Sequence, residues 1–139
     1  MASQLYTNYL NLMLGDDSAA HSLPDLDTDT IKCALVNGTD DYTFSAAHQD
    51  KGDVTSYGAS TDQTLSNITI TAGVVDNTAD LTFTSVVLDV SDVDILVHYQ
   101  DSGTPGTSPL ICYHDAFTPV TPNGGNITVA YNASGIFAL

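Results

Sequence analysis

Short runs of alternating apolar and polar residues, separated by turn-forming residues, dominate this sequence from residue 29 onward. In a β-strand successive side chains point to opposite faces, so an apolar residue at every second position predicts a strand with one buried face. Within Ser66–Ala72, Ile68, Ile70 and Ala72 alternate with polar residues. We therefore expect these three apolar side chains to face inward and the intervening Asn and Thr side chains to face solvent.

Two runs, Ile95–Tyr99 and Leu110–Tyr113, are apolar at nearly every position, which predicts central strands buried on both faces. Runs with one apolar face occur at three further places, Ile31–Leu35, Leu81–Phe83 and Ile127–Tyr131, and a last expected strand, Ile136–Leu139, closes the chain. Clusters of Gly, Pro and Asn between the runs predict turns. The pattern predicts a mainly β fold, an antiparallel β-sandwich or barrel of about seven short strands at residues 29–139.

The first 15 residues have a helical rather than a strand-like period. Polar residues recur at the spacing of one helix face, with Ser3 as the expected N-cap and Gly15 as the expected C-terminal stop. A helix this short is marginal in water unless it docks on something. We therefore expect an N-terminal amphipathic helix or arm at residues 1–15, whose apolar face contributes the candidate assembly-interface residues Leu5, Tyr6, Tyr9, Leu10 and Met13. A second, short helix is expected at Ser45–Lys51.

The charge of the chain is strongly one-sided. Its 139 residues include 17 acids, all of them Asp, while Lys32 and Lys51 are the only Lys or Arg residues, giving a formal net charge of -15. Proteins that bind nucleic acids neutralise phosphates with Lys and Arg, so this composition argues against a nucleic-acid partner. Binding to an anionic membrane is disfavoured for the same reason.

The cysteines, Cys33 and Cys112, lie in expected buried strands. The first 14 residues lack the basic region of a secretory signal, so we expect synthesis in a reducing cytoplasm. Buried free thiols are therefore expected rather than a disulfide.

Catalytic motifs are missing from the sequence. Without Glu there is no H-E-x-x-H zinc motif, and neither a P-loop nor a G-x-S-x-G elbow occurs. We therefore expect a protein without enzymatic activity and without a catalytic residue or cofactor. His98 and His114, with Cys112, would approach one another if their strands pair, but their spacing is not that of a known metal motif, and no metal site is predicted.

An Asp-rich run, Asp25–Thr30, begins like a calcium-binding loop, with carboxylates at alternate positions. The Gly and Glu that an EF-hand needs at its sixth and twelfth positions are replaced by Thr30 and Val36. A second group, Asp89, Asp92 and Asp94, precedes a strand without completing a motif. Because Asp is also a good turn residue, solvated loops are the favoured interpretation.

Residues 29–36 and 40–43 resemble an opening pattern, DTIKVALVD followed by DYT, and residues 119–129 and 136–139 resemble a closing pattern, PVTPNGGDITV followed by IFKL. Further similar blocks lie between them at residues 79–84, 96–101 and 108–115. With these blocks the chain resembles a family of small structural proteins of tailed bacteriophages. This sequence differs from the family in having fewer cations. Cys33 takes the place of a usual valine, and Ala138 takes the place of a usual basic residue near the C-terminus.

The resemblance implies a virion protein and carries over no catalytic residue. A capsid decoration (cement) protein on the outer surface of the capsid fits best, with the major capsid protein as partner and a homo-oligomer, such as a trimer, on the shell. The protein would be made in the host cytoplasm and located on the capsid exterior. The alternatives are a tail, neck or fibre-associated subunit and a host-surface binding module, for which Tyr42, Tyr57 and Tyr131 are candidate exposed aromatics.

Overall fold

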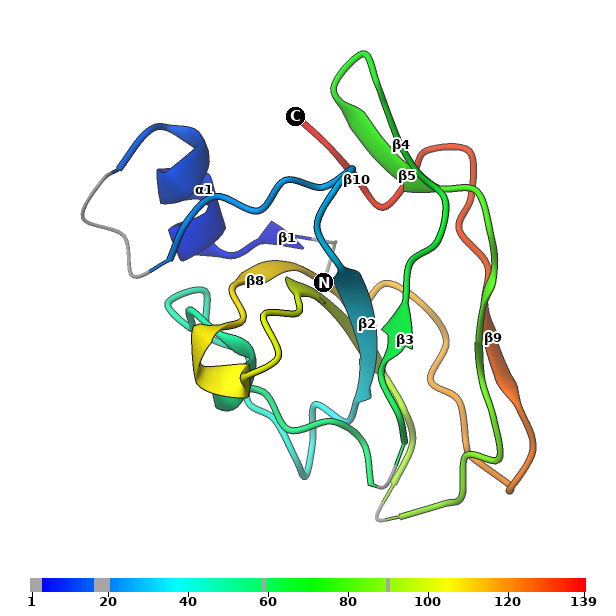
Figure 1. The fold of residues 1–139 in the computed structure, drawn as a ribbon. Helices are drawn as coiled ribbons and strands as arrows, with labels where there is room; N and C mark the ends of the chain where they lie inside the picture. Colours follow the sequence, from blue (N-terminus) through cyan, green and yellow to red (C-terminus); the bar gives the residue numbers. More distant parts are fainter. Residues whose placement is uncertain (1–3, 17–20, 59, 90) are drawn as a thin grey trace.

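A computed structural model describes residues 4–16, 21–58, 60–89 and 91–139. Over these residues the fold is mainly β, with antiparallel sheets and one α-helix near the N-terminus (Figure 1). The strands are β1 (Gln4–Leu5), β2 (Ile31–Val36), β3 (Gln63–Thr64), β4 (Ile68–Thr71), β5 (Val74–Asn77), β6 (Leu81–Phe83), β7 (Ile95–Gln100), β8 (Leu110–His114), β9 (Ile127–Val129) and β10 (Phe137–Ala138). The α-helix is α1 (Thr7–Met13), and short 3-10 helices lie at Lys51–Asp53 and Pro105–Thr107.

The largest sheet has the strand order β1-β8-β7-β2-β3. Its centre is the antiparallel pair β2–β7, which runs in register from Ile31 opposite Gln100 to Val36 opposite Ile95. Strand β7 is buried from Ile95 to Tyr99, and β8 from Leu110 to Tyr113. The two runs that are apolar on both faces are therefore central strands, as the sequence predicts.

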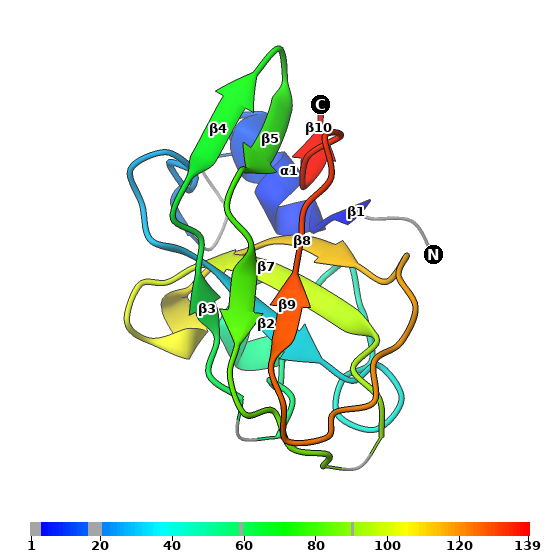
Figure 2. The same cartoon turned by 90° about the vertical axis from the view of Figure 1, so that its right-hand side faces the viewer.

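A second layer crosses one face of this sheet (Figure 2). It consists of a three-stranded sheet in the order β10-β5-β4 and a two-stranded sheet of β6 and β9. Strand β6 follows the predicted pattern, because Leu81 and Phe83 are buried while Thr82 is exposed. The arrangement is sandwich-like and has about ten strands rather than the expected seven.

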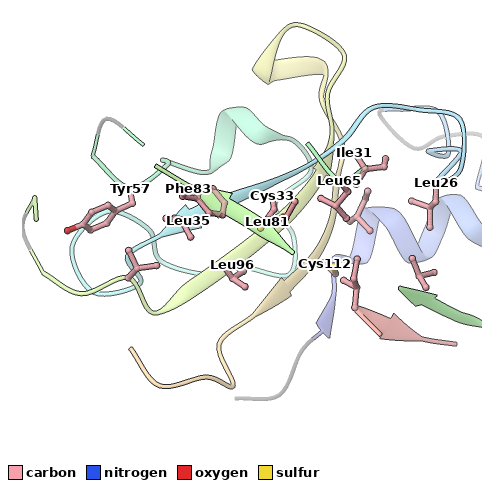
Figure 3. Packing of buried hydrophobic residues seen from close by; sticks show 14 of the residues in the cluster. Leu26, Ile31, Cys33, Leu35, Tyr57, Leu65, Leu81, Phe83, Leu96 and Cys112 are labelled. Atoms are coloured by element: carbon pink, nitrogen blue, oxygen red, sulfur yellow. The ribbon is translucent and has the colours of Figure 1, made fainter. Parts of the chain in front are cut away.

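Each face of the large sheet has its own hydrophobic cluster. The cluster between the two layers contains Cys33, Leu35 and Leu96 from the large sheet and Leu81 and Phe83 from the second layer (Figure 3). The cluster on the opposite face is covered by the segment that follows β2 and by Tyr6. Its buried members are Tyr6, Ala34, Val36, Tyr42, Val54, Ile95, Val97, Tyr99, Leu110 and Tyr113.

The N-terminal helix is shorter than expected. It begins at Thr7 with Tyr6 in the N-cap position, because Gln4 and Leu5 instead pair with β8. The expected cap, Ser3, lies outside the described residues. The predicted stop is confirmed, since Gly15 follows the helix with a φ of 84°, a conformation that glycine adopts at little cost.

Three further expectations are wrong. Ile70 does not face inward but is 52% exposed, because the β4–β5 hairpin projects beyond the large sheet at this end of the molecule (Figure 2). Ala72 is also exposed, in the turn to β5. The helix expected at Ser45–Lys51 is absent; the chain makes a turn at Ser45–His48 and then the 3-10 helix Lys51–Asp53, whose Asp50 side chain accepts a hydrogen bond from the Gly52 amide.

The N-terminal segment contributes to the core of the domain. Tyr6 is fully buried and its hydroxyl lies 2.9 Å from that of Tyr42, while Tyr9 is 3% exposed and packs edge-on against Phe137 of β10. Leu14, just past the helix, is by contrast 87% exposed. The N-terminal segment is thus packed on the domain at Tyr6 and Tyr9 and exposed to solvent at Leu14.

Replacing Tyr9 by alanine is expected to lower the free energy of unfolding by about 3–5 kcal/mol, the usual cost of deleting a large buried aromatic side chain. The matched exposed variant, Leu14→Ala, should change it by less than about 0.5 kcal/mol. Urea unfolding followed by circular dichroism measures both. Equal, small effects of the two variants would contradict the packing of this helix on the domain.

Candidate functional site

One end of the molecule carries an apolar surface. Helix α1, the β4–β5 hairpin and the C-terminus lie at this end (Figures 1 and 2). Large apolar side chains are exposed on these segments and on the loop before β2. They are Leu10, Leu14, Leu23, Ile70 and Leu139, with exposed fractions from 38% to 87%.

Part of this surface is hollowed into an open groove of about 450 Å³ between α1, the loop before β2 and β4. We call this groove the α1–β4 groove; its lining residues are Tyr9, Met13, Leu23, Pro24, Asp25, Leu26 and Ile70. Because the lining is mostly apolar and the groove is open, it has the character of a surface on which another apolar group docks.

The five candidate interface residues differ from one another in how deeply they are buried. Tyr6 is inside the domain, and Tyr9 is buried although it borders the groove. Leu5 and Met13 are half-buried against the core, and Leu10 is 38% exposed. The groove also uses Leu23 and Ile70, which sequence reasoning missed because they come from segments far from the helix along the chain.

Both lysines are paired with aspartates. The Lys32 ammonium contacts the Asp101 carboxylate, which holds the pKa of Asp101 below its usual range. The Lys51 ammonium donates a hydrogen bond to the Val54 carbonyl at 2.8 Å and lies 3.9 Å from Asp62. The remaining aspartates leave a surface with a strong excess of negative charge.

The Asp-rich segments are built as turns. The Asp29 carboxylate accepts hydrogen bonds from the Asp25 amide and from the Gln100 side chain. In the second group Asp94 accepts from the Gly38 amide and Asp92 from the Thr121 hydroxyl. These three carboxylates therefore accept hydrogen bonds from donors within the chain.

The candidate aromatics for host binding are mostly interior. Tyr57 is fully buried and Tyr42 is 5% exposed, and each uses its hydroxyl in hydrogen bonds within the chain. Tyr131 is half-buried, and its hydroxyl lies 2.7 Å from the His98 Nε2 atom. Two of the three are thus packing residues.

The large sheet brings histidines and cysteines together in its interior. In the register of the central strands, Cys33 of β2 lies opposite His98 of β7, and His98 lies opposite Cys112 of β8. His114 is two residues beyond Cys112 on the same strand and hence on the same face. Three of these side chains, His98, Cys112 and His114, place one potential ligand atom each within 4.8 Å of one another.

Contacts within this cluster, the His98–Cys112–His114 cluster, are close. The Cys112 Sγ atom lies 3.5 Å from the His114 Nε2 atom, and the two imidazole rings meet edge to face with centroids 5.2 Å apart. A cavity of about 240 Å³ borders the cluster and is lined by His114, Tyr131 and apolar side chains from β7 and the segment around β9. The cluster is therefore interior but reached from a cavity.

Burial controls the protonation of these groups. Loss of hydration lowers the pKa of His98 well below its usual value and that of His114 to about 4. Burial also raises the pKa of the Cys112 thiol well above its ordinary range. At neutral pH both imidazoles are therefore uncharged and the thiol keeps its proton.

Cys33 and Cys112 are both buried free thiols, as expected. The pairing register explains why, because His98 stands between them in the sheet. The two strands that carry the cysteines are not neighbours, since β7 separates β2 from β8.

No helix within the described residues is both long and apolar enough to cross a membrane. Comparison of the chain with known proteins found no matching family model, no matching curated protein and no matching solved structure. Its function is therefore argued from its own residues and geometry.

Proposed function

We propose that this chain is a structural, non-enzymatic protein of a tailed-bacteriophage virion, and specifically a capsid decoration protein that binds the outer surface of the major capsid protein lattice. The observation that carries the proposal is the α1–β4 groove together with the exposed leucines around it, on a small domain with a formal net charge of -15. A decoration protein needs this combination, since one face docks on the shell and the rest faces solvent.

The resemblance to small phage structural proteins supports the same role. Its matched blocks coincide with secondary structure: residues 29–36 contain β2, residues 96–101 include most of β7, and residues 108–115 contain β8. Those three strands form the centre of the large sheet. The resemblance therefore concerns the part of the sequence that determines the fold.

Charge favours the outside of the shell over the inside. With a formal net charge of -15 and both lysines paired, the chain would be repelled by packaged DNA. On the outer surface the same charge keeps the particle soluble, and it favours docking on a shell surface of opposite sign. A homo-oligomer on the lattice, such as a trimer, would bring several grooves together at one site.

The proposal is tested by quantitative mass spectrometry of purified particles from the phage whose genome encodes this chain. A ratio to the major capsid protein near one to one, or one copy for each local three-fold position, is the expected result. A few copies per particle would contradict a capsid position and indicate the neck, tail or fibres. Absence from the particle would contradict a virion role altogether.

The docking face is tested by a charge substitution. Ile70→Asp places a carboxylate at the apolar groove on a side chain that is already 52% exposed, so it should weaken binding to shells while changing the stability of the free protein little. Val87→Asp is the matched control, since Val87 is 66% exposed but does not line the groove. Co-sedimentation with shells that lack the protein measures both.

Full binding by Ile70→Asp, or equal losses with the two variants, would contradict docking through the α1–β4 groove. Thermal unfolding of each variant serves as the folding control.

A further inference from the structure

The His98–Cys112–His114 cluster is unused by the proposed docking role, and it has the donor set of a metal site. Two imidazole nitrogens and one thiolate sulfur are the ligands that zinc prefers in proteins. Among the described residues this is the group of three potential ligands that lies close enough to share one ion. Aspartates elsewhere on the described surface form no such group.

The spacing of the ligand atoms fits tetrahedral coordination. With Zn–S of about 2.3 Å and Zn–N of about 2.0–2.1 Å, tetrahedral geometry separates the sulfur and nitrogen ligands by about 3.6 Å. The Cys112 Sγ and His114 Nε2 atoms already lie 3.5 Å apart. The widest separation in the group is within 4.8 Å, so side-chain rotations that bring the ligand atoms closer by at most about 1.5 Å close the set around one ion.

His98 has a ring nitrogen available for this ion. The side chain is 1% exposed, and its Nδ1 atom is buried without a hydrogen-bond partner. Such an orphaned polar atom costs free energy in a metal-free interior, and a metal bond would satisfy it. The other nitrogen, Nε2, lies 2.7 Å from the Tyr131 hydroxyl, so with Nδ1 as ligand it donates a hydrogen bond to the tyrosine oxygen.

That hydrogen bond is the arrangement that usually orients a metal-bound histidine, in which the second ring nitrogen is held by a polar group. The neighbouring cavity of about 240 Å³ supplies the other requirement, a route for the ion, because His114 and Tyr131 both line it. It also leaves room for water as a fourth ligand. The sheet thus provides three ligands and an open position.

We propose that His98, Cys112 and His114 bind one Zn²⁺ ion per chain, with Tyr131 as a positioning residue for His98. On binding, the Cys112 thiol loses its proton to solvent as the zinc–sulfur bond forms, while the two neutral imidazoles donate lone pairs without proton loss. Each ion bound therefore releases one proton. The strongly negative charge of the chain favours uptake of a cation.

The test titrates the full-length, chelator-treated protein with Zn²⁺ and, in parallel, with Co²⁺ as a spectroscopic probe. We expect one ion per chain, a rise in melting temperature with Zn²⁺, and a thiolate-to-cobalt charge-transfer band with Co²⁺. The Co²⁺ spectrum of the unaltered protein reports sulfur ligation directly, so the result does not depend on whether a variant folds.

Variants locate the site. Cys112→Ala removes the sulfur ligand and should abolish the charge-transfer band. His114→Ala removes one nitrogen ligand and should abolish stoichiometric binding and the stabilisation by Zn²⁺. Cys33→Ala is the matched control, because Cys33 is an equally buried thiol in the same cross-strand row but lies outside the trio. Tyr131→Phe should keep the stoichiometry and weaken affinity about 10–100-fold.

The proposal is overturned if the unaltered protein binds no Zn²⁺ at micromolar concentration, or binds Co²⁺ without the charge-transfer band. It is equally overturned if the band persists in Cys112→Ala, or if Ca²⁺ displaces the ion, which would assign binding to surface carboxylates.

Discussion

The antiparallel pairing of β2 with β7 and of β7 with β8 is the interaction on which the rest of the structure depends. Strand β7 is buried from Ile95 to Tyr99, so its backbone groups have no access to water and are satisfied by the flanking strands. The apolar side chains on its two faces must then be shielded from solvent by two different parts of the chain. The second layer of strands covers one face, and the segment after β2 with Tyr6 covers the other.

The same register determines what chemistry the interior contains. Because side chains alternate along each strand, Cys33, His98 and Cys112 form one row across the sheet on the face that meets the second layer. A polar row in that position is costly unless its atoms find partners. The Tyr131 hydroxyl is hydrogen-bonded to His98 Nε2, while His98 Nδ1 has no hydrogen-bond partner. We propose that a bound metal ion is the partner of Nδ1.

How far the sequence predicts this fold depends on the element. Runs apolar on both faces, as in β7 and β8, identify central strands because such a run is unfavourable anywhere else. The alternation in β4 gave a wrong prediction for Ile70, because the β4–β5 hairpin projects beyond the large sheet (Figure 2) and leaves this side chain 52% exposed. Strand β5 was not predicted because its Asp76 and Asn77 are residue types that are rare in strands. In the structure the buried Asn77 side chain is accommodated because it accepts a hydrogen bond from the Asn67 amide.

The candidate sites were predictable only in part. The spacing of Cys112 and His114 on one strand places both on one face, which the sequence alone reveals. Bringing His98 beside them requires the pairing of β7 with β8 in the register that sets His98 opposite Cys112, and this register is not encoded locally. The α1–β4 groove likewise joins Met13, Leu23 and Ile70, which are distant in sequence and meet only through tertiary packing.

A small sheet-centred domain with an apolar groove at one end and a strong excess of negative charge is suited to attachment at that end. The most direct test of this proposed attachment is a cryo-electron microscopy reconstruction of the phage particle in which we propose that this chain is located. The account predicts density for this domain on the outer surface of the shell, with α1 and β4 against the major capsid protein. Density confined to the tail or neck, or attachment through the opposite end of the domain, would contradict it.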